Sequence, residues 1–281
     1  MRVLVVGDIM LDRYIYGSVK RISPEAPVPV FNRESEKETL GGCGNVCVNL
    51  AKLGVDVECV AWIGDDADGC EIISLILKNG IGNRLSIYGG TKTTVKNRIV
   101  DKVSGQQLLR IDDEAVFCVG VNPNELFGSY DAIIVSDYGK GAIDAAVMNT
   151  VKNLGAPVIV DPYPEHGWWY DNVFMITPNE KEYNELRHKP DCSYVLKTLG
   201  ANGMVVSTGF GDVQIPAQQV KIYDVQGAGD TVVAVMAYCI GSGMDVVESA
   251  KIANQCAGYV VTQPGTAYVP KEILVKAIAN V

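Results

Sequence analysis

The sequence predicts an α/β fold: a Rossmann-like, mostly parallel central sheet flanked by helices, with a small β-sheet lid. Apolar runs that end in a carboxylate, at residues 132–137 and 157–162, alternate with helical patterns such as residues 142–154. This alternation is typical of parallel sheets with helices on both faces. The chain has 281 residues, 48% hydrophobic and 20% charged, which predicts a single domain over residues 1–281.

The charge balance argues against some classes of function. Asp and Glu number 33 against 24 Lys and Arg, for a net charge of −9. We therefore expect no nucleic-acid partner, which would need a basic face, although a few local cations would suffice for a small anionic substrate. The eight cysteines include no Cys-x-x-Cys pair, so neither a disulfide framework nor a zinc site is expected. Without a bilayer-length apolar run or a signal-peptide segment, the expected location is cytoplasmic, with no membrane partner.

The first strand is expected at residues 3–6, and it leads to Asp8 and Asp12. Ligands of open α/β sheets bind beyond the carboxyl ends of the strands, so both carboxylates fall where a substrate would lie. Asp12 is suited to accept hydrogen bonds from sugar hydroxyls. The alternative is a loop or capping carboxylate.

Several strand-like segments fall outside the alternating pattern. They lie at residues 14–31, 84–87, 93–100 and 108–111. We expect them to form a lid, roughly residues 13–40 and 84–111, that covers the site and excludes water. The alternative is a set of extra edge strands on one large sheet. Prolines in the first segment favour edge strands, and such edges could pair across a homodimer.

A glycine cluster at residues 41–44 opens a helix expected at 46–53. Backbone without a Cβ allows close approach of a polar ligand, which makes Gly42 and Asn45 candidates for ligand binding. Asn45 could instead cap the helix. A strand at 57–63 and a helix at 68–78 are expected next.

The strands in the middle of the chain end in acidic or polar residues. These residues are Asp137, Asp161, Asn179 and Glu182. Each alone could be a helix cap or a solvated loop group, but their recurrence at one edge of the sheet favours a site. Carboxylates and an amide beside a nucleotide usually organise Mg²⁺ through water.

The glycine-rich turn at residues 227–229 is the stretch on which the rest of the site depends. It joins a β-like run at 213–225 to an apolar helix at 232–240. Free N–H groups at the start of a helix bind anions, and Asp230 at the same start is a candidate base. Phosphoryl transfer to a hydroxyl needs such an anion hole beside a proton acceptor.

Two further helices are expected at residues 246–261 and 271–281. Asn254 on the first of them is either exposed or faces a nucleotide. Residues 203–207 are expected to form a strand that leads to a turn at 208–211.

Together these segments resemble the ribokinase/PfkB family of carbohydrate kinases over nearly the whole chain. The segments that carry the resemblance are VGDIMLDRY at 6–14, RISPEAPVPV at 21–30, GGCGNV at 41–46, QQLLR at 106–110, VSDYGKG at 135–141, TPN at 177–179 and YDVQGAGDT at 223–231. The resemblance implies a ribokinase fold and transfer of phosphate from ATP to a sugar.

The resemblance also implies roles for individual residues. Asp230 matches the catalytic base, and Gly227, Ala228 and Gly229 match the anion hole. Asn179 and Glu182 match the motif that places Mg²⁺ and the nucleotide phosphates. The positions that match sugar-hydroxyl ligands are Asp12, Gly42 and Asn45, and those expected near the nucleotide are Ser207, Gly209, Gly211 and Asn254. Many family members also bind a monovalent cation such as K⁺ near the glycine-rich turn.

Within the family, the likeness is greatest to the heptose 7-phosphate kinases of lipopolysaccharide precursor synthesis. This implies phosphorylation of D-glycero-β-D-manno-heptose 7-phosphate at its C1 hydroxyl to give the 1,7-bisphosphate. No nucleotidyltransferase segment follows in the sequence, so a separate nucleotidyltransferase is expected downstream. The existing phosphate needs cations, and the candidates are Arg98, Lys102, Arg110 and Lys140.

Two departures from the pattern keep alternatives open. Gln226 stands where the family usually has Thr or Ser, and Tyr163-Pro164 stands where heptose kinases have Lys-Gly. One alternative is a PfkB-type kinase for another sugar, sugar phosphate or nucleoside. The other is a catalytically silent sugar- or nucleotide-binding regulator.

Overall fold

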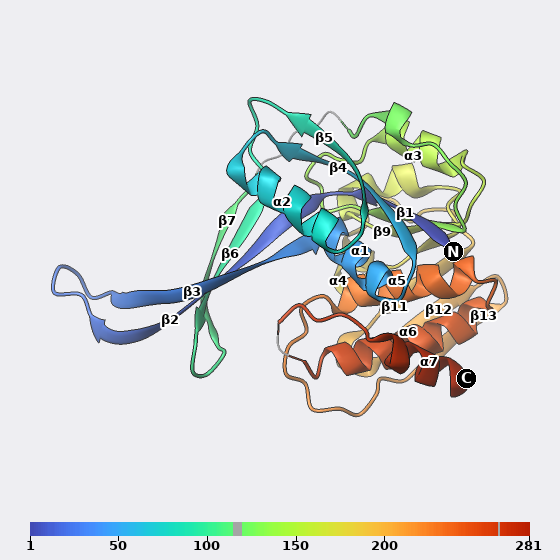
Figure 1. Ribbon diagram of the computed structural model, residues 1–281. Helices are drawn as coiled ribbons and strands as arrows, with labels where there is room; N and C mark the ends of the chain where they lie inside the picture. Colours follow the sequence, from blue (N-terminus) through green and yellow to red (C-terminus); the bar gives the residue numbers. More distant parts are fainter. Residues whose placement is uncertain (115–119, 264) are drawn as a thin grey trace.

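A nine-stranded sheet forms the centre of the computed structural model, which describes residues 1–114, 120–263 and 265–281 (Figure 1). Its strand order is β13 (Gly211–Ile215), β12 (Met204–Thr208), β11 (Tyr194–Thr198), β10 (Met175–Ile176), β9 (Val158–Asp161), β8 (Ala132–Ser136), β1 (Arg2–Gly7), β4 (Asp56–Gly64), β5 (Gly82–Tyr88). Neighbouring strands from β11 to β5 are parallel. β12 pairs antiparallel with β11, and β13 pairs antiparallel with β12. The predicted fold class is therefore confirmed.

Helices cover both faces of this sheet. One face carries α1 (Cys43–Lys52), α2 (Ala67–Lys78), α5 (Ala228–Gly241), α6 (Val246–Val260) and α7 (Lys271–Ala279). The other carries α3 (Ala145–Lys152), α4 (Glu180–Glu185) and the 3₁₀ segments Pro123–Glu125 and Pro164–Tyr170. In β1, Val3 and Val5 belong to the first core, and Leu4 and Val6 to the second. Because side chains alternate along a strand, a continuous apolar run fills both cores.

A second sheet of four strands stands apart from the first. Its order is β3 (Pro29–Gly42), β2 (Ile9–Ile22), β6 (Val95–Asp101), β7 (Gln107–Asp113), and we call it the small sheet. β2 and β3 extend away from the body of the molecule (Figure 1). The expected 13–40 segment lies in the small sheet, but the 84–111 segment is divided. β5 pairs in parallel with β4 and so belongs to the nine-stranded sheet.

Some other boundaries differ from expectation. The helix expected from residue 142 begins at Ala145, because the Asp144 side chain accepts a hydrogen bond from the Val147 N–H and caps it there. The β-like run expected at 213–225 is a strand only as far as Ile215. No helix in the described ranges combines the length and apolar character needed to cross a bilayer.

Candidate active site

The site lies at the carboxyl edge of the parallel strands, where three hollows share residues. The smallest, of about 190 Å³, is lined by Asp230, Gly227 and Gly229. It shares Gly229 and Thr198 with a hollow of about 380 Å³. It shares four residues, including Asp161 and Glu182, with a third hollow of about 600 Å³. The three form one cleft, with Asp230 in its middle compartment.

The glycine-rich turn presents the backbone at the start of α5. Gly227 precedes the helix with a φ of 74°, and a Cβ there would meet the Asn45 Nδ2 at 2.9 Å. Only glycine fits both constraints. The Asp224 carboxylate fixes the turn by accepting hydrogen bonds from the N–H groups of Gln226 and Gly265. No side chain caps α5 among the described residues. The Ala228 N–H donates to the Val225 carbonyl at 3.3 Å, so the neighbouring N–H groups at the start of the helix are the ones most available to an anion.

Asp230 is held by two neutral donors. The Asn45 Nδ2 donates to its Oδ2 at 2.6 Å, and the Tyr138 hydroxyl donates to its Oδ1 at 2.9 Å. Burial raises the pKa of the Asp230 carboxyl, and the two donors oppose that rise. A carboxylate of raised pKa is a stronger base than an exposed one. Asn45 contacts Asp230 rather than capping α1, whose cap position is Gly42.

Asp8 fixes the loop that carries Tyr138. Its carboxylate accepts hydrogen bonds from the backbone N–H groups of Tyr138, Lys140 and Ala142 at 2.7–3.0 Å. Asp8 is only 2% exposed, so this carboxylate shapes the loop and is not presented to a ligand. The position of the Tyr138 hydroxyl, and through it that of Asp230, therefore depends on Asp8.

Asp12 faces the site from β2 and is paired. Its Oδ1 accepts from the Arg98 Nη2 at 3.0 Å and the Arg98 Nε at 3.3 Å. Gly41 leaves room for this carboxylate, since a Cβ there would lie 2.6 Å from the Asp12 Oδ2. Gly42 has a φ of 58°, and a Cβ there would lie 2.3 Å from the Asp8 carbonyl oxygen. Gly42 thus supports the close approach of β3 to the loop after β1.

All four candidate phosphate-binding cations contact a carboxylate. Besides the Arg98–Asp12 pair, Lys102 contacts Glu34 at 2.9 Å, Arg110 contacts Asp112 at 2.9 Å and Lys140 contacts Glu114 at 2.7 Å. Lys102 is half exposed on the small sheet. A ligand phosphate would have to share or replace these carboxylate partners.

Asn179 and Glu182 form a capping box at the start of α4. The Asn179 Oδ1 accepts from the Glu182 N–H at 2.9 Å, and the Glu182 Oε2 accepts from the Asn179 N–H at 2.8 Å. Both line the middle compartment with Asp161. Burial raises the pKa of the Asp161 carboxyl well above its usual range, and the carboxylates of Glu182 and Asp230 raise it further.

The carboxylates of the middle compartment suit a cation held through water. Asp161, Glu182 and Asp230 line it without any Lys or Arg among the described lining residues, so a divalent cation would relieve their mutual repulsion. No group of three or more acidic, His or Cys side chains in the described residues is close enough to hold a metal directly. The donors present therefore fit hydrated Mg²⁺ better than a dehydrated ion.

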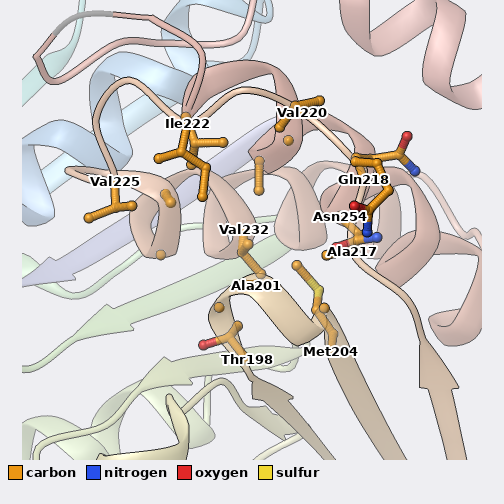
Figure 2. A pocket seen from close by; sticks show the side chains of 18 residues that line it. Thr198, Ala201, Met204, Ala217, Gln218, Val220, Ile222, Val225, Val232 and Asn254 are labelled. Atoms are coloured by element: carbon orange, nitrogen blue, oxygen red, sulfur yellow. The ribbon is translucent and has the colours of Figure 1, made fainter.

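The 380 Å³ hollow is largely apolar and lies beside α5 and α6 (Figure 2). Val220, Ile222 and Val225 form one wall, with Met204 opposite (Figure 2). Asn254 reaches it from α6 and donates to the Pro216 carbonyl at 2.7 Å. Its size and lining are suited to a flat aromatic ring such as adenine.

The structure places Ser207, Gly209 and Gly211, predicted near the nucleotide, away from the cleft. β12 runs antiparallel to β11, so Ser207 pairs with Val195 at the start of β11 and Met204 pairs with Thr198 at its end. The turn after β12 therefore lies at the opposite edge of the sheet from the cleft. The residues missed in its place are Thr198, Gly200 and Gly203, which line the hollow. The sequence contains a signal for these residues, namely a strand that ends at Thr198 and is followed by Gly200 and Gly203.

Gln226 joins the glycine-rich turn to the small sheet. Its Oε1 accepts from the Tyr14 hydroxyl at 2.9 Å, and the same hydroxyl lies 2.6 Å from the Thr266 Oγ1. The Gln226 side chain thus points toward β2.

Comparison with known proteins finds a family profile and relatives that are similar to this chain in sequence. A family profile described as "pfkB family carbohydrate kinase" matches residues 1–273. The bifunctional protein HldE of Campylobacter fetus subsp. fetus is 37% identical over 297 residues, 95% of this chain and 64% of that protein. HldE of Rhodospirillum rubrum is 36% identical over 310 residues, 99% of this chain and 62% of that protein. The chain thus spans less than two thirds of the length of these relatives.

Solved structures share the fold at lower sequence identity. The ribokinase of Thermotoga maritima superposes with a TM-score of 0.77 at 22% identity, and 99% of each chain is covered. Phosphofructokinase-2 of Escherichia coli, in complex with potassium, gives a TM-score of 0.79 at 18% identity, with 99% of this chain and 98% of the other covered.

Proposed function

Because this chain belongs to the PfkB family of carbohydrate kinases, which are ATP-dependent, we propose that its acceptor is D-glycero-β-D-manno-heptose 7-phosphate. The product would be the 1,7-bisphosphate, a precursor for ADP-heptose and lipopolysaccharide synthesis. Support comes from the HldE relatives at 36–37% identity and from the heptose-kinase segments of the sequence. The observation that carries the proposal is the Asp230 carboxylate beside the open N-terminus of α5.

The chemistry follows from these neighbours. Asp230 takes the proton of the C1 hydroxyl as the hydroxyl oxygen attacks the γ-phosphorus of ATP. The bond from the γ-phosphorus to the β,γ-bridging oxygen breaks, and ADP leaves. The N–H groups at Gly227, Ala228 and Gly229 would stabilise the charge that develops on the transferring group, and the Ala228 N–H would share its long bond to the Val225 carbonyl with that group. Mg²⁺, held through water near Asn179, Glu182 and Asp161, would neutralise charge on the nucleotide phosphates. The 380 Å³ hollow beside Asn254 would take the adenine.

The small sheet would bind the acceptor and exclude water as a lid. Asp12 would accept hydrogen bonds from sugar hydroxyls, and the Asn45 amide would donate to them or accept from them. Gly42 would allow the sugar to approach the backbone closely. Arg98, Lys102, Arg110 and Lys140 are the candidates for the existing phosphate. All four are paired with carboxylates, and burial favours Arg98, on the inner strand β6, over Arg110 and Lys102, whose side chains are each about half exposed.

The proposal includes a homodimer, a bound monovalent cation and a cellular location. β3 is an edge strand of the small sheet, so it could pair with a second copy in a homodimer. A K⁺ ion near the glycine-rich turn is supported by the potassium complex of E. coli phosphofructokinase-2. Cytoplasmic location and a nucleotidyltransferase step downstream accord with the proposed product.

A screen of acceptors with labelled ATP tests the proposal. The panel should contain heptose 7-phosphate, fructose 6-phosphate, ribose and nucleosides. We expect kcat/KM to be highest for heptose 7-phosphate. Preference for another acceptor would instead favour a different PfkB-type kinase, for which Tyr163-Pro164 is the observation in support. ATP binding without transfer to any acceptor would favour the silent regulator.

A further inference from the structure

One face of the small sheet is turned toward the cleft, and Lys96 lies on it. In the β2–β6 ladder, Asp12 is paired with Lys96 and Tyr14 with Arg98. Alternation along strands places these four side chains on one face. The Tyr14 hydroxyl contacts Gln226 in the glycine-rich turn, so this is the face that meets the site.

The cations on this face differ in their contacts. Opposite Arg98 and Lys96, β7 adds Arg110 and Asp112 to the same face. Arg98 pairs with Asp12 and Arg110 pairs with Asp112. Lys96 has no carboxylate within the 4.0 Å of an ion pair in the described ranges of the chain. Arg98 and Arg110 thus each hold a carboxylate in contact, whereas Asp12, Asp112 and Asp230 act on Lys96 only from beyond ion-pair distance.

Lys96 is half-buried, and burial lowers the pKa of its ammonium. Its Nζ lies 5.5 Å from the centre of the Tyr138 ring, and the Tyr138 hydroxyl contacts Asp230. A cation–π contact compensates only part of the lost hydration. A partly buried ammonium without an anion in direct contact is costly, and a ligand anion would supply that contact.

We propose that Lys96 binds the phosphate already present on the acceptor and so makes the enzyme select a phosphorylated sugar over a neutral one. The inference rests on the proposed sugar-kinase function and adds the residue that recognises the substrate class. Lys96 belongs to the acceptor side, since it lies on the small sheet beside Asp12. A phosphate there would also lie beside Arg98 and Arg110, whose guanidinium groups can share their carboxylates with it.

Lys96→Met, which keeps the aliphatic stem, tests this assignment. We expect the KM for heptose 7-phosphate to rise about 10- to 100-fold, the usual effect of losing one contact to a charged group. The KM for ATP and the KM for the dephosphorylated heptose should change less than about twofold. Lys96→Arg should recover most of the selectivity. Lys20→Met, an exposed lysine near the far end of β2, is the control and should match the wild type.

Two results would overturn the assignment. A fall in kcat with an unchanged KM for heptose 7-phosphate would assign Lys96 to the transferring phosphoryl group. An equal rise in KM for the phosphorylated and neutral sugars would make its role structural. Thermal melting checks folding, and Lys96→Gln replaces Lys96→Met if the latter is unstable.

Calorimetry of the Asp230→Asn protein separates this inference from the proposed function. Heptose 7-phosphate should bind this protein, and adding Lys96→Met should weaken that binding at least tenfold. If the wild type phosphorylates no acceptor, the proposed function fails, while the calorimetric comparison still decides the role of Lys96. Equal binding with and without Lys96→Met would reject it.

Discussion

The two halves of the site are fixed by different kinds of contact. Around Asp230, neutral donors hold the carboxylate, namely the Asn45 amide and the Tyr138 hydroxyl. On the small sheet, ion pairs dominate, with Arg98 on Asp12 and Arg110 on Asp112. The first half stands on the buried parallel sheet and α5, whereas the strands of the second extend from the body (Figure 1).

This difference separates chemistry from recognition. Neutral donors orient a carboxylate and leave it charged, so it remains a base. Ion pairs can exchange one partner for a ligand anion. We therefore expect changes near Asp230 to act mainly on kcat, and changes on the small sheet to act mainly on the KM of the acceptor.

The largest expected effect is that of Asp230→Asn. Removal of the base should lower kcat by about 10²- to 10⁴-fold, while ATP still binds, because the 380 Å³ hollow does not include this side chain. Steady-state kinetics and calorimetry with ATP measure the two quantities. Asp212→Asn, on the exposed strand β13, is the control. Near-wild-type turnover of Asp230→Asn would exclude Asp230 as the base.

The importance of this half could be predicted from the sequence because its determinants are local. Gly227 and Asp230 lie three positions apart, and a glycine turn before an apolar helix predicts an open helix start without knowledge of the rest of the chain. The alternation of strands and helices likewise predicted the parallel sheet. What the sequence did not show is that Asn45 and Tyr138 meet at Asp230, since those contacts join residues 185 and 92 positions apart.

The next effect is that of Arg98→Ala, which acts in the second half. The KM for a phosphorylated acceptor should rise about 10- to 100-fold. Asp12, 6% exposed, would lose its partner, and breaking a buried pair in this way typically costs about 3–5 kcal/mol of stability. The double variant Arg98→Ala/Asp12→Asn removes the orphaned charge and serves as the stability control in thermal melts. An unchanged KM in Arg98→Ala would reject its role in phosphate binding.

This half was harder to predict because its contacts depend on which strands become neighbours. Arg98 was expected on the strand at 93–100 and Lys102 just after it, but only the pairing of β6 with β2 shows that Arg98 meets Asp12. The same limit explains why two segments lie elsewhere than expected. Nothing near Gly82–Tyr88 shows that β5 pairs with β4, and nothing near Ser207 shows that β12 turns antiparallel.

A smaller effect is expected from Tyr138→Phe, which removes one of the two donors to Asp230. Hydrogen bonds to a carboxylate stabilise its charged form and so lower its pKa. Loss of the Tyr138 donor should therefore raise the pKa of Asp230 and move the acid limb of the kcat profile to higher pH. At neutral pH, kcat should fall less than about tenfold. A pH–rate series on both proteins measures the shift, and coincident acid limbs would show that the Tyr138 hydroxyl does not tune the base.

The smallest effect is expected where the two halves meet, at the Tyr14 hydroxyl. It contacts Gln226 and Thr266, at the glycine-rich turn and the loop after α6. Each neutral hydrogen bond contributes roughly 0.5–1.5 kcal/mol, so Tyr14→Phe should change kcat and the acceptor KM together by less than about tenfold. A joint change is the sign of a residue that couples the halves, in contrast to the separate effects above.

Tyr16→Phe is the matched control for that variant. Its ring stacks on Tyr14 with centroids 6.4 Å apart, so it reports ring packing in the same sheet. Gln226→Thr restores the residue type expected in the family and shortens the side chain, so it should break the contact with Tyr14 and reproduce the effect of Tyr14→Phe. If Tyr14→Phe leaves both constants unchanged, or alters only one of them, the halves work independently. Gln226 would then be a substitution that the turn merely accommodates.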